Sequence, residues 1–335
     1  MRAILVGVFA GSVLVAFACG GTSSSATPAT TDDLGTDDTG TSSGKKSPSG
    51  DDDDDTATDQ PVVGYVTLVS TTNTNAGKPS SSNALFAGFS HPYTLNNNCG
   101  EKKVDQCTVW PAPQCASKCA AGEACQWKSD CSGAVCVPAP EGTCKDDETF
   151  QINANDQWEC VRYSDRLDAG RVTIARSGKS TSIFAPDYSE ATLSIPYSFA
   201  AKYSVMTSGG DVAKFSGTLT TPAELGSNVA DLSASVLEPG GSFELTWKKS
   251  TDPIVIYVSG GAGRFQCKLE DDPGHFEIGA DLLDEARGDS AYVSVGRNRT
   301  THVQDVKATA NGKTLTGNVE LIGSVVEGIA LTKAE

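Results

Sequence analysis

Residues 301–321 read THVQDVKATANGKTLTGNVEL, and this stretch indicates the fold class of the chain. Two segments in which apolar and polar residues alternate, 301–308 and 314–321, flank the dipeptide Asn311-Gly312. Both residues of this dipeptide tolerate a positive φ, as the tight turn between two antiparallel strands requires. The stretch therefore predicts a two-residue β-hairpin.

Similar short segments recur from residue 169 onward and are separated by Gly, Asn, Asp and Pro. Regularly spaced strands with such turn signals are typical of antiparallel sandwiches. The further strands expected here are 171–175, 192–199, 203–207, 212–219, 231–236, 243–248, 254–259, 264–269 and 291–295, with earlier ones at 61–69 and 84–89. A helical pattern occurs at 280–287. The body is thus predicted to be mainly β, an antiparallel β-sandwich with a small disulfide-rich, loop-dominated insertion.

The 335-residue chain is acidic, with 26 Lys and Arg against 42 Asp and Glu, a net charge of −16. Nucleic-acid binding needs a basic surface that faces the phosphates. The charge balance therefore argues against nucleic acid, and also against an anionic membrane surface, as a partner.

The first eighteen residues have the layout of a secretory signal peptide. Met1-Arg2 is followed by an uncharged, mostly apolar segment, 3–18, which is shorter than the 20 or so residues that span a bilayer. Small residues lead directly into Cys19, which resembles the bacterial lipobox, whose cysteine is diacylated. We therefore predict a lipid on Cys19 and a membrane partner through it; the alternative is a freely secreted protein with a spare thiol.

Residues 19–60 are predicted to form a disordered acidic linker behind that lipidated cysteine. Gly, Ser, Thr and Asp dominate the segment, and its two lysines against ten aspartates give −8, half of the charge of the whole chain. Such a composition cannot bury enough apolar surface to offset the entropy of ordering.

Nine of the eleven cysteines fall within residues 99–160, which we predict to be a cysteine-rich segment inserted into a body formed by 61–98 and 161–335. So short a segment needs cross-links to fold. The disulfide candidates are Cys99, Cys107, Cys115, Cys119, Cys125, Cys131, Cys136, Cys144, Cys160 and Cys267. Setting Cys19 aside leaves these ten cysteines, an even number, so that all of them can pair.

Zinc is the competing interpretation, since Cys115-x3-Cys119 and Cys131-x4-Cys136 have spacings that zinc sites use. The export signal and the lack of histidine in the segment favour disulfides, so we expect no metal and no cofactor. The connectivity stays open; a bond between Cys160 and Cys267 is one expectation, with Cys99 as the alternative partner.

The segment CASKCAAGEACQW at 115–127 resembles small cysteine-rich modules of secreted myxobacterial proteins, and a wider resemblance covers the body. The stretches AGRVTI (169–174), FSGTL (215–219), LTW (245–247), FQC (265–267) and DDPGHF (271–276) resemble, in that order, a β-sandwich domain of uncharacterised myxobacterial-type secreted lipoproteins. The resemblance implies the architecture and the address of a secreted lipoprotein, but no catalytic residues. Gly20 rather than Asp follows Cys19, which resembles lipoproteins sorted to the outer membrane.

Candidate residues for chemistry are few and scattered. The histidines His91, His275 and His302 are far apart in sequence, and there is no H-E-x-x-H motif and no C-x-x-C motif. Carboxylate pairs such as 271/272 and 284/285 could serve a glycosidase, yet pairs of this kind arise by chance among 42 acidic residues.

These observations predict a non-catalytic envelope lipoprotein with a structural or interaction role, exported and lipid-anchored at the outer membrane or cell surface. The first alternative is a surface module that binds carbohydrate or protein through Trp110 and Trp127. The second is a secreted hydrolase. We expect Trp247, on an alternating strand, to pack in the core.

Overall fold

The computed structural model describes residues 60–90, 99–138, 140, 143–144, 148–153, 155, 157–162, 166–185, 187–191 and 193–333. The chain divides into the units Met1–Gln60 and Pro61–Glu335, and every element below belongs to the second. The predicted signal peptide, Cys19 and the linker up to residue 59 lie outside the described residues. None of the helices in the described ranges is long and apolar enough to cross a bilayer.

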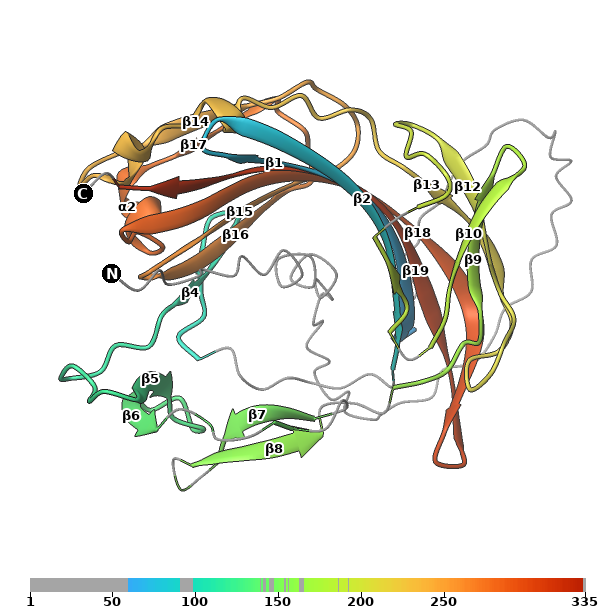
Figure 1. Cartoon of the computed structure of the whole chain (residues 1–335), viewed down its shortest axis with the longest axis horizontal. Helices are drawn as coiled ribbons and strands as arrows, with labels where there is room; N and C mark the ends of the chain where they lie inside the picture. The colour runs from blue at the N-terminus through green and yellow to red at the C-terminus, as the bar shows by residue number, and fades with distance from the viewer. Residues whose placement is uncertain are drawn as a thin grey trace, which may run out of the picture. The chain divides into compact units, whose positions relative to one another are not determined.

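Nine strands form the largest sheet, and Figure 1 shows its longest members, β1, β2, β18 and β19, side by side. In order across the sheet the strands are β11 (Ser189–Glu190), β2 (Lys78–Phe89), β1 (Val62–Asn75), β19 (Lys313–Thr332), β18 (Ser290–Ala310), β15 (Ile254–Gly260), β16 (Gly263–Leu269), β4 (Cys107–Pro111) and β3 (Lys102–Val104). All neighbours in this sheet are antiparallel except β1 and β19, which are parallel.

The predicted hairpin at Asn311 and Gly312 is confirmed. Ala310 pairs with Lys313, and the two residues between them have φ values of 50° and 75°, as a type I′ turn requires. The strands are longer than predicted, because the expected strands 291–295 and 301–308 are parts of the single strand β18. Residues 296–300 (GRNRT) have a turn-like composition but pair continuously with β19.

A second sheet packs against one part of the first and makes the body a sandwich of β-layers. Its strands are β10 (Lys179–Ile183), β9 (Val172–Arg176), β12 (Lys202–Thr207) and β13 (Ser216–Thr220), in that order. Val66 and Leu85 of the large sheet share a buried cluster with Ile174 and Val205 of the small one. The predicted class, mainly β with antiparallel sheets, is confirmed.

A second buried cluster lies under another set of elements. A separate two-stranded sheet of β14 (Phe243–Thr246) and β17 (His275–Ile278) contributes Leu245, and the helix α2 (Ala280–Asp284) contributes Leu283. These residues pack with Ile256 of β15 and Phe265 of β16. Two 3-10 turns, η1 (Val229–Asp231) and η2 (Ala234–Leu237), complete this core.

Both cores lie on the same face of the large sheet. Side chains alternate between the faces of a strand, so odd-numbered residues of β19 share one face. Val319 and Leu321 belong to the first cluster, whereas Val325 and Ile329 belong to the second. The long strands β18 and β19 therefore run from one core to the other.

A buried ion pair lies between the cores along β18. The side chains of Arg297 and Asp272 are both 0% exposed, with Nη2 2.8 Å from Oδ2. Arg297 also donates to the backbone carbonyls of Ala223, Glu224 and Lys248. The guanidinium thus holds three loops, which contain residues 223–224, 248 and 272, against the large sheet.

Two predicted strands are wrong. Residues 231–236 fall in and between the turns η1 and η2, whose residues Val229 and Leu237 are buried in the second core. The described part of 192–199 has no strand, although Ile195 is buried; Pro196 lacks the N–H that a ladder needs. The helix α2 is shorter than the predicted 280–287.

Within the predicted cysteine-rich segment, 99–160, the strands β3 and β4 belong to the nine-stranded sheet. Only the part of the segment beyond Pro111 forms sheets of its own. These are two hairpins, β5 (Glu123–Trp127) with β6 (Ala134–Pro138), and β7 (Glu148–Ile152) with β8 (Trp158–Arg162).

Candidate functional site

The ten cysteines of the described residues form five disulfides. The bonds are Cys99–Cys131, Cys107–Cys267, Cys115–Cys125, Cys119–Cys136 and Cys144–Cys160. Cys19, the predicted lipid carrier, lies outside the described residues. All of the described cysteines are therefore disulfide-bonded.

The expected bond between Cys160 and Cys267 is wrong. Cys267 of β16 lies directly opposite Cys107 of β4 in the large sheet and bonds to it, whereas Cys160 of β8 bonds to Cys144. The Cys107–Cys267 bond is buried in the second core, at 2% and 0% exposure. It fixes the start of the cysteine-rich segment to the body.

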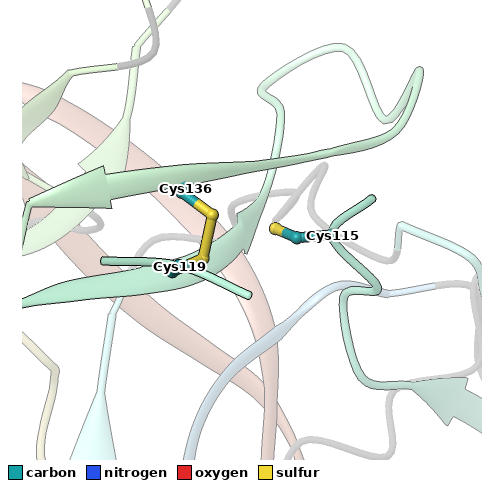
Figure 2. Close-up of side chains that lie close together, drawn as sticks. All are labelled: Cys115, Cys119 and Cys136. Carbon is teal, nitrogen blue, oxygen red and sulfur yellow. A yellow bond between two sulfur atoms is a disulfide. The ribbon is translucent and has the colours of Figure 1, made fainter. Parts of the chain in front are cut away.

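Two further disulfides lie against each other at the β5–β6 hairpin. Cys125 and Cys136 face each other across the hairpin, yet each bonds to a cysteine of the preceding loop, Cys115 and Cys119 respectively. The Sγ atoms of Cys115, Cys119 and Cys136 lie within 4.8 Å of one another. Figure 2 shows these three side chains close together. All three residues are half-buried.

The loop is held close to the hairpin by more than its disulfides. The Cys125 sulfur lies 3.4 Å from the carbonyl oxygen of Pro113, and the Cys136 sulfur lies 3.9 Å from that of Ser117. The side chain of Glu123, at the start of β5, accepts a hydrogen bond from the backbone N–H of Ala120 at 3.1 Å. Backbone and side-chain contacts thus determine where the loop cysteines lie.

The two tryptophans predicted to bind ligands are half-buried and packed. Trp110 of β4 donates from Nε1 to Glu101, and the guanidinium of Arg264 lies 5.4 Å from its ring centroid. The ring of Trp127 lies over Gly100, where an added Cβ would be 3.2 Å from it. The structure does not bring the two rings together as one exposed platform, and a ligand that stacks on the face of Trp110 under Arg264 would compete with the guanidinium.

The other two tryptophans tie elements together. Trp247 is 7% exposed in the second core, which confirms the prediction that it packs there. Trp158 of β8 donates from Nε1 to the carbonyl of Pro138 at 2.7 Å and so joins the β7–β8 hairpin to β6. This role of Trp158 was not predicted, because a contact across 20 residues leaves no local pattern.

Asp272, of the acidic pair 271/272 considered for catalysis, makes structural contacts. Asp272 accepts hydrogen bonds from Trp247 Nε1 and from the backbone N–H of Ser250 and Gly274, besides the ion pair with Arg297. Burial by itself would raise the pKa of the Asp272 carboxyl. These donors and the guanidinium outweigh burial and hold that pKa below its usual range.

The second acidic pair is likewise engaged: Asp284 pairs with Arg287, and Glu285 with Lys102 of β3. Of the histidines, His91 lies outside the described residues, and His275 is exposed on β17. His302 of β18 faces Glu320 of β19, with 3.8 Å between Nε2 and Oε1. Burial raises the pKa of the Glu320 carboxyl, and His302 partly counteracts this.

Among the residues that the structure describes, one group of three or more side chains could place metal-ligand atoms this close together, namely the sulfur cluster of the β5–β6 hairpin. Comparison with protein-family models, with curated proteins and with solved structures finds no significant match to this chain. The candidate functional site therefore rests on its own geometry.

Proposed function

We propose that this chain is an exported, non-catalytic lipoprotein of the bacterial envelope, held at the outer membrane by lipid on Cys19, with a structural or interaction role. The observation that carries the proposal is the pairing of ten cysteines into five disulfides. Structural disulfides persist in oxidising compartments and are rare in the cytosol. Such a compartment agrees with the signal-like segment at 1–18.

The parity of the cysteines supports the anchor. Ten of the eleven cysteines form disulfides, so Cys19, which directly follows the apolar segment, is the one cysteine left for a lipid. A lipoprotein consumes that sulfur in a thioether to diacylglycerol. Two acyl chains bind a bilayer firmly, whereas a single chain binds only marginally.

The contacts of the polar residues support a non-catalytic role. The carboxylates of Asp272 and Asp252 are buried and engaged by arginines, and Glu327 accepts hydrogen bonds from the backbone of Gly226 and Ser227. Groups held in this way stabilise loops on the sheet and are not free to exchange protons with a substrate.

The test is metabolic labelling with radioactive palmitate, followed by fractionation of the membranes. We expect the wild type to carry label and to sediment with the outer membrane. Cys19→Ser should lose the label and be released, whereas Cys160→Ser, which also removes one cysteine, should keep it. An unlabelled wild type, or a Cys19→Ser variant that still carries label, would overturn the proposed anchor.

A further inference from the structure

Four sulfur atoms converge where the loop after β4 meets the β5–β6 hairpin. Three of them lie within 4.8 Å of one another, and the fourth, of Cys125, is bonded to Cys115 at 2.07 Å. They come from two places in the chain, a loop that carries Cys115 and Cys119 and a hairpin that carries Cys125 and Cys136. Figure 2 draws three of them, Cys115, Cys119 and Cys136. Two pairs of ligands from two chain segments are the arrangement that structural zinc sites use.

The spacing of one pair of ligands and the distances among three of the sulfurs suit zinc. Cys115 and Cys119 are separated by three residues, within the two to four of a zinc-binding pair. In a tetrahedral site with Zn–S bonds of about 2.3 Å, the sulfur atoms are roughly 3.8 Å apart. Three of the sulfurs already lie within 4.8 Å of one another, and reduction frees the bonded ones to move apart to this separation.

We propose that reduction of both disulfides converts this cluster into a thiolate site for one Zn²⁺. Its four ligands are Cys115, Cys119, Cys125 and Cys136. Each disulfide takes two electrons and two protons from a dithiol reductant, which itself becomes a disulfide. The four thiols formed then lose four protons as they bind the metal, because the thiolate is the metal ligand.

The fold favours this site over the other cysteines. The Cys107–Cys267 bond is buried in the second core, where a reductant has little access. Of the two remaining disulfides, Cys99–Cys131 joins the start of the segment to the turn after β5. Cys144–Cys160 joins a residue before β7 to strand β8. Within the described residues, neither belongs to a close group of three or more ligand atoms. Reduction there would give isolated pairs of thiols.

The inference is tested on the full chain, reduced with a phosphine and titrated with Co²⁺ and then with Zn²⁺. The phosphine takes its oxygen from water and yields two thiols for each disulfide, and it supplies no thiol of its own. We expect one Co²⁺ per chain, with the visible absorption of a tetrahedral tetrathiolate, displaced by one Zn²⁺. Alkylation of the Zn²⁺-loaded chain, followed by peptide mapping, should leave the four proposed ligands protected.

Matched variants separate this site from other thiols. Cys119→Ser should weaken Zn²⁺ binding by more than the ~100-fold that loss of an outer-shell partner costs. The double variant Cys144→Ser/Cys160→Ser, which removes a neighbouring disulfide, should bind Zn²⁺ as the wild type does. No metal bound after reduction, protection of Cys99 or Cys144 instead, or an unchanged affinity of Cys119→Ser would each overturn the inference. None of these outcomes bears on the lipid anchor, which palmitate labelling tests independently.

Discussion

Replacing Asp272 by Asn should destabilise the body severely, because it leaves the guanidinium of Arg297 buried without its counter-charge. Both side chains are 0% exposed, so water cannot take the place of the lost carboxylate. Removal of one partner of a buried pair costs about 3–5 kcal/mol. Since 1.4 kcal/mol is a factor of ten, the folded-to-unfolded ratio should fall by roughly two to three and a half orders of magnitude.

The contacts of Asp272 indicate where in this range the variant should lie. The carboxylate also accepts hydrogen bonds from Trp247 and from two backbone N–H groups, and an amide can accept only part of them. We therefore expect the upper half of the range. In the double variant Asp272→Asn/Arg297→Met, the orphaned charge is absent, so its cost should be less than the sum of the two single costs.

Urea unfolding of the oxidised protein, followed by tryptophan fluorescence and by circular dichroism, measures these values. Asp281→Asn in the first turn of α2 is the matched control, because Asp281 is exposed. The control should change the free energy of unfolding by less than about 0.5 kcal/mol. If Asp272→Asn costs no more than this control, or if the two single costs simply add, the ion pair does not hold the loops in place.

The Asp272–Arg297 ion pair makes the stability of the body depend on pH. The pKa of Asp272 is lower in the folded protein than in the unfolded chain, so its stabilisation is fully present above the unfolded pKa of about 3.9. That stabilisation should be lost as the pH falls through the folded pKa. The difference in stability between wild type and Asp272→Asn should therefore shrink below pH 4, and a constant difference would contradict the assignment.

Three further perturbations test other parts of the body. Replacing both Cys107 and Cys267 by Ser opens a loop of 160 residues and should lower the free energy of unfolding by up to about 5 kcal/mol, as urea unfolding measures. Gly312→Ala introduces a Cβ at φ +75° and should cost about 1 kcal/mol, whereas Gly279→Ala, at φ −70° with open space around it, should cost less; thermal unfolding compares them. Glu320→Gln should be less destabilising at pH 7 than at pH 3, because the raised pKa of Glu320 makes its ionised form the unfavourable one; a stability–pH profile that runs the other way would contradict this.

Features determined by neighbouring residues could be predicted from the sequence. The Asn311-Gly312 turn needs only two residues that tolerate positive φ between alternating segments, and the structure has that turn. Strand β12 (Lys202–Thr207) likewise follows its alternation closely, with every second side chain buried.

Features determined by distant residues could not be predicted. The parallel pairing of β1 with β19 joins residues about 250 positions apart, and no local pattern specifies it. Residues 296–300 resemble a turn because Gly and Asn are depleted in strands, yet Arg297 is the buried cation that pairs with Asp272. A strand is therefore missed by composition alone when it buries a charged side chain that pairs with a distant residue.

The candidate site was predictable in content but not in connectivity. The count and the spacing of the cysteines indicate cross-links, but Cys125 and Cys136, which face each other, bond elsewhere. The pairing depends on where the loop after Pro111 lies, and that position is set by contacts such as the one between Cys125 and the carbonyl of Pro113.

The parallel alignment of β1 and β19 has a mechanical consequence. Val62, where β1 begins, lies beside Asn318 near the start of β19, whereas β19 continues to Thr332 at the far end of the pair. A force that pulls on the chain before Val62 and is resisted at Thr332 acts along the two strands in opposite directions. The whole ladder then bears the load in shear, and its bonds must break together rather than one at a time. A body tethered at its amino-terminal side would be expected to resist stretching well.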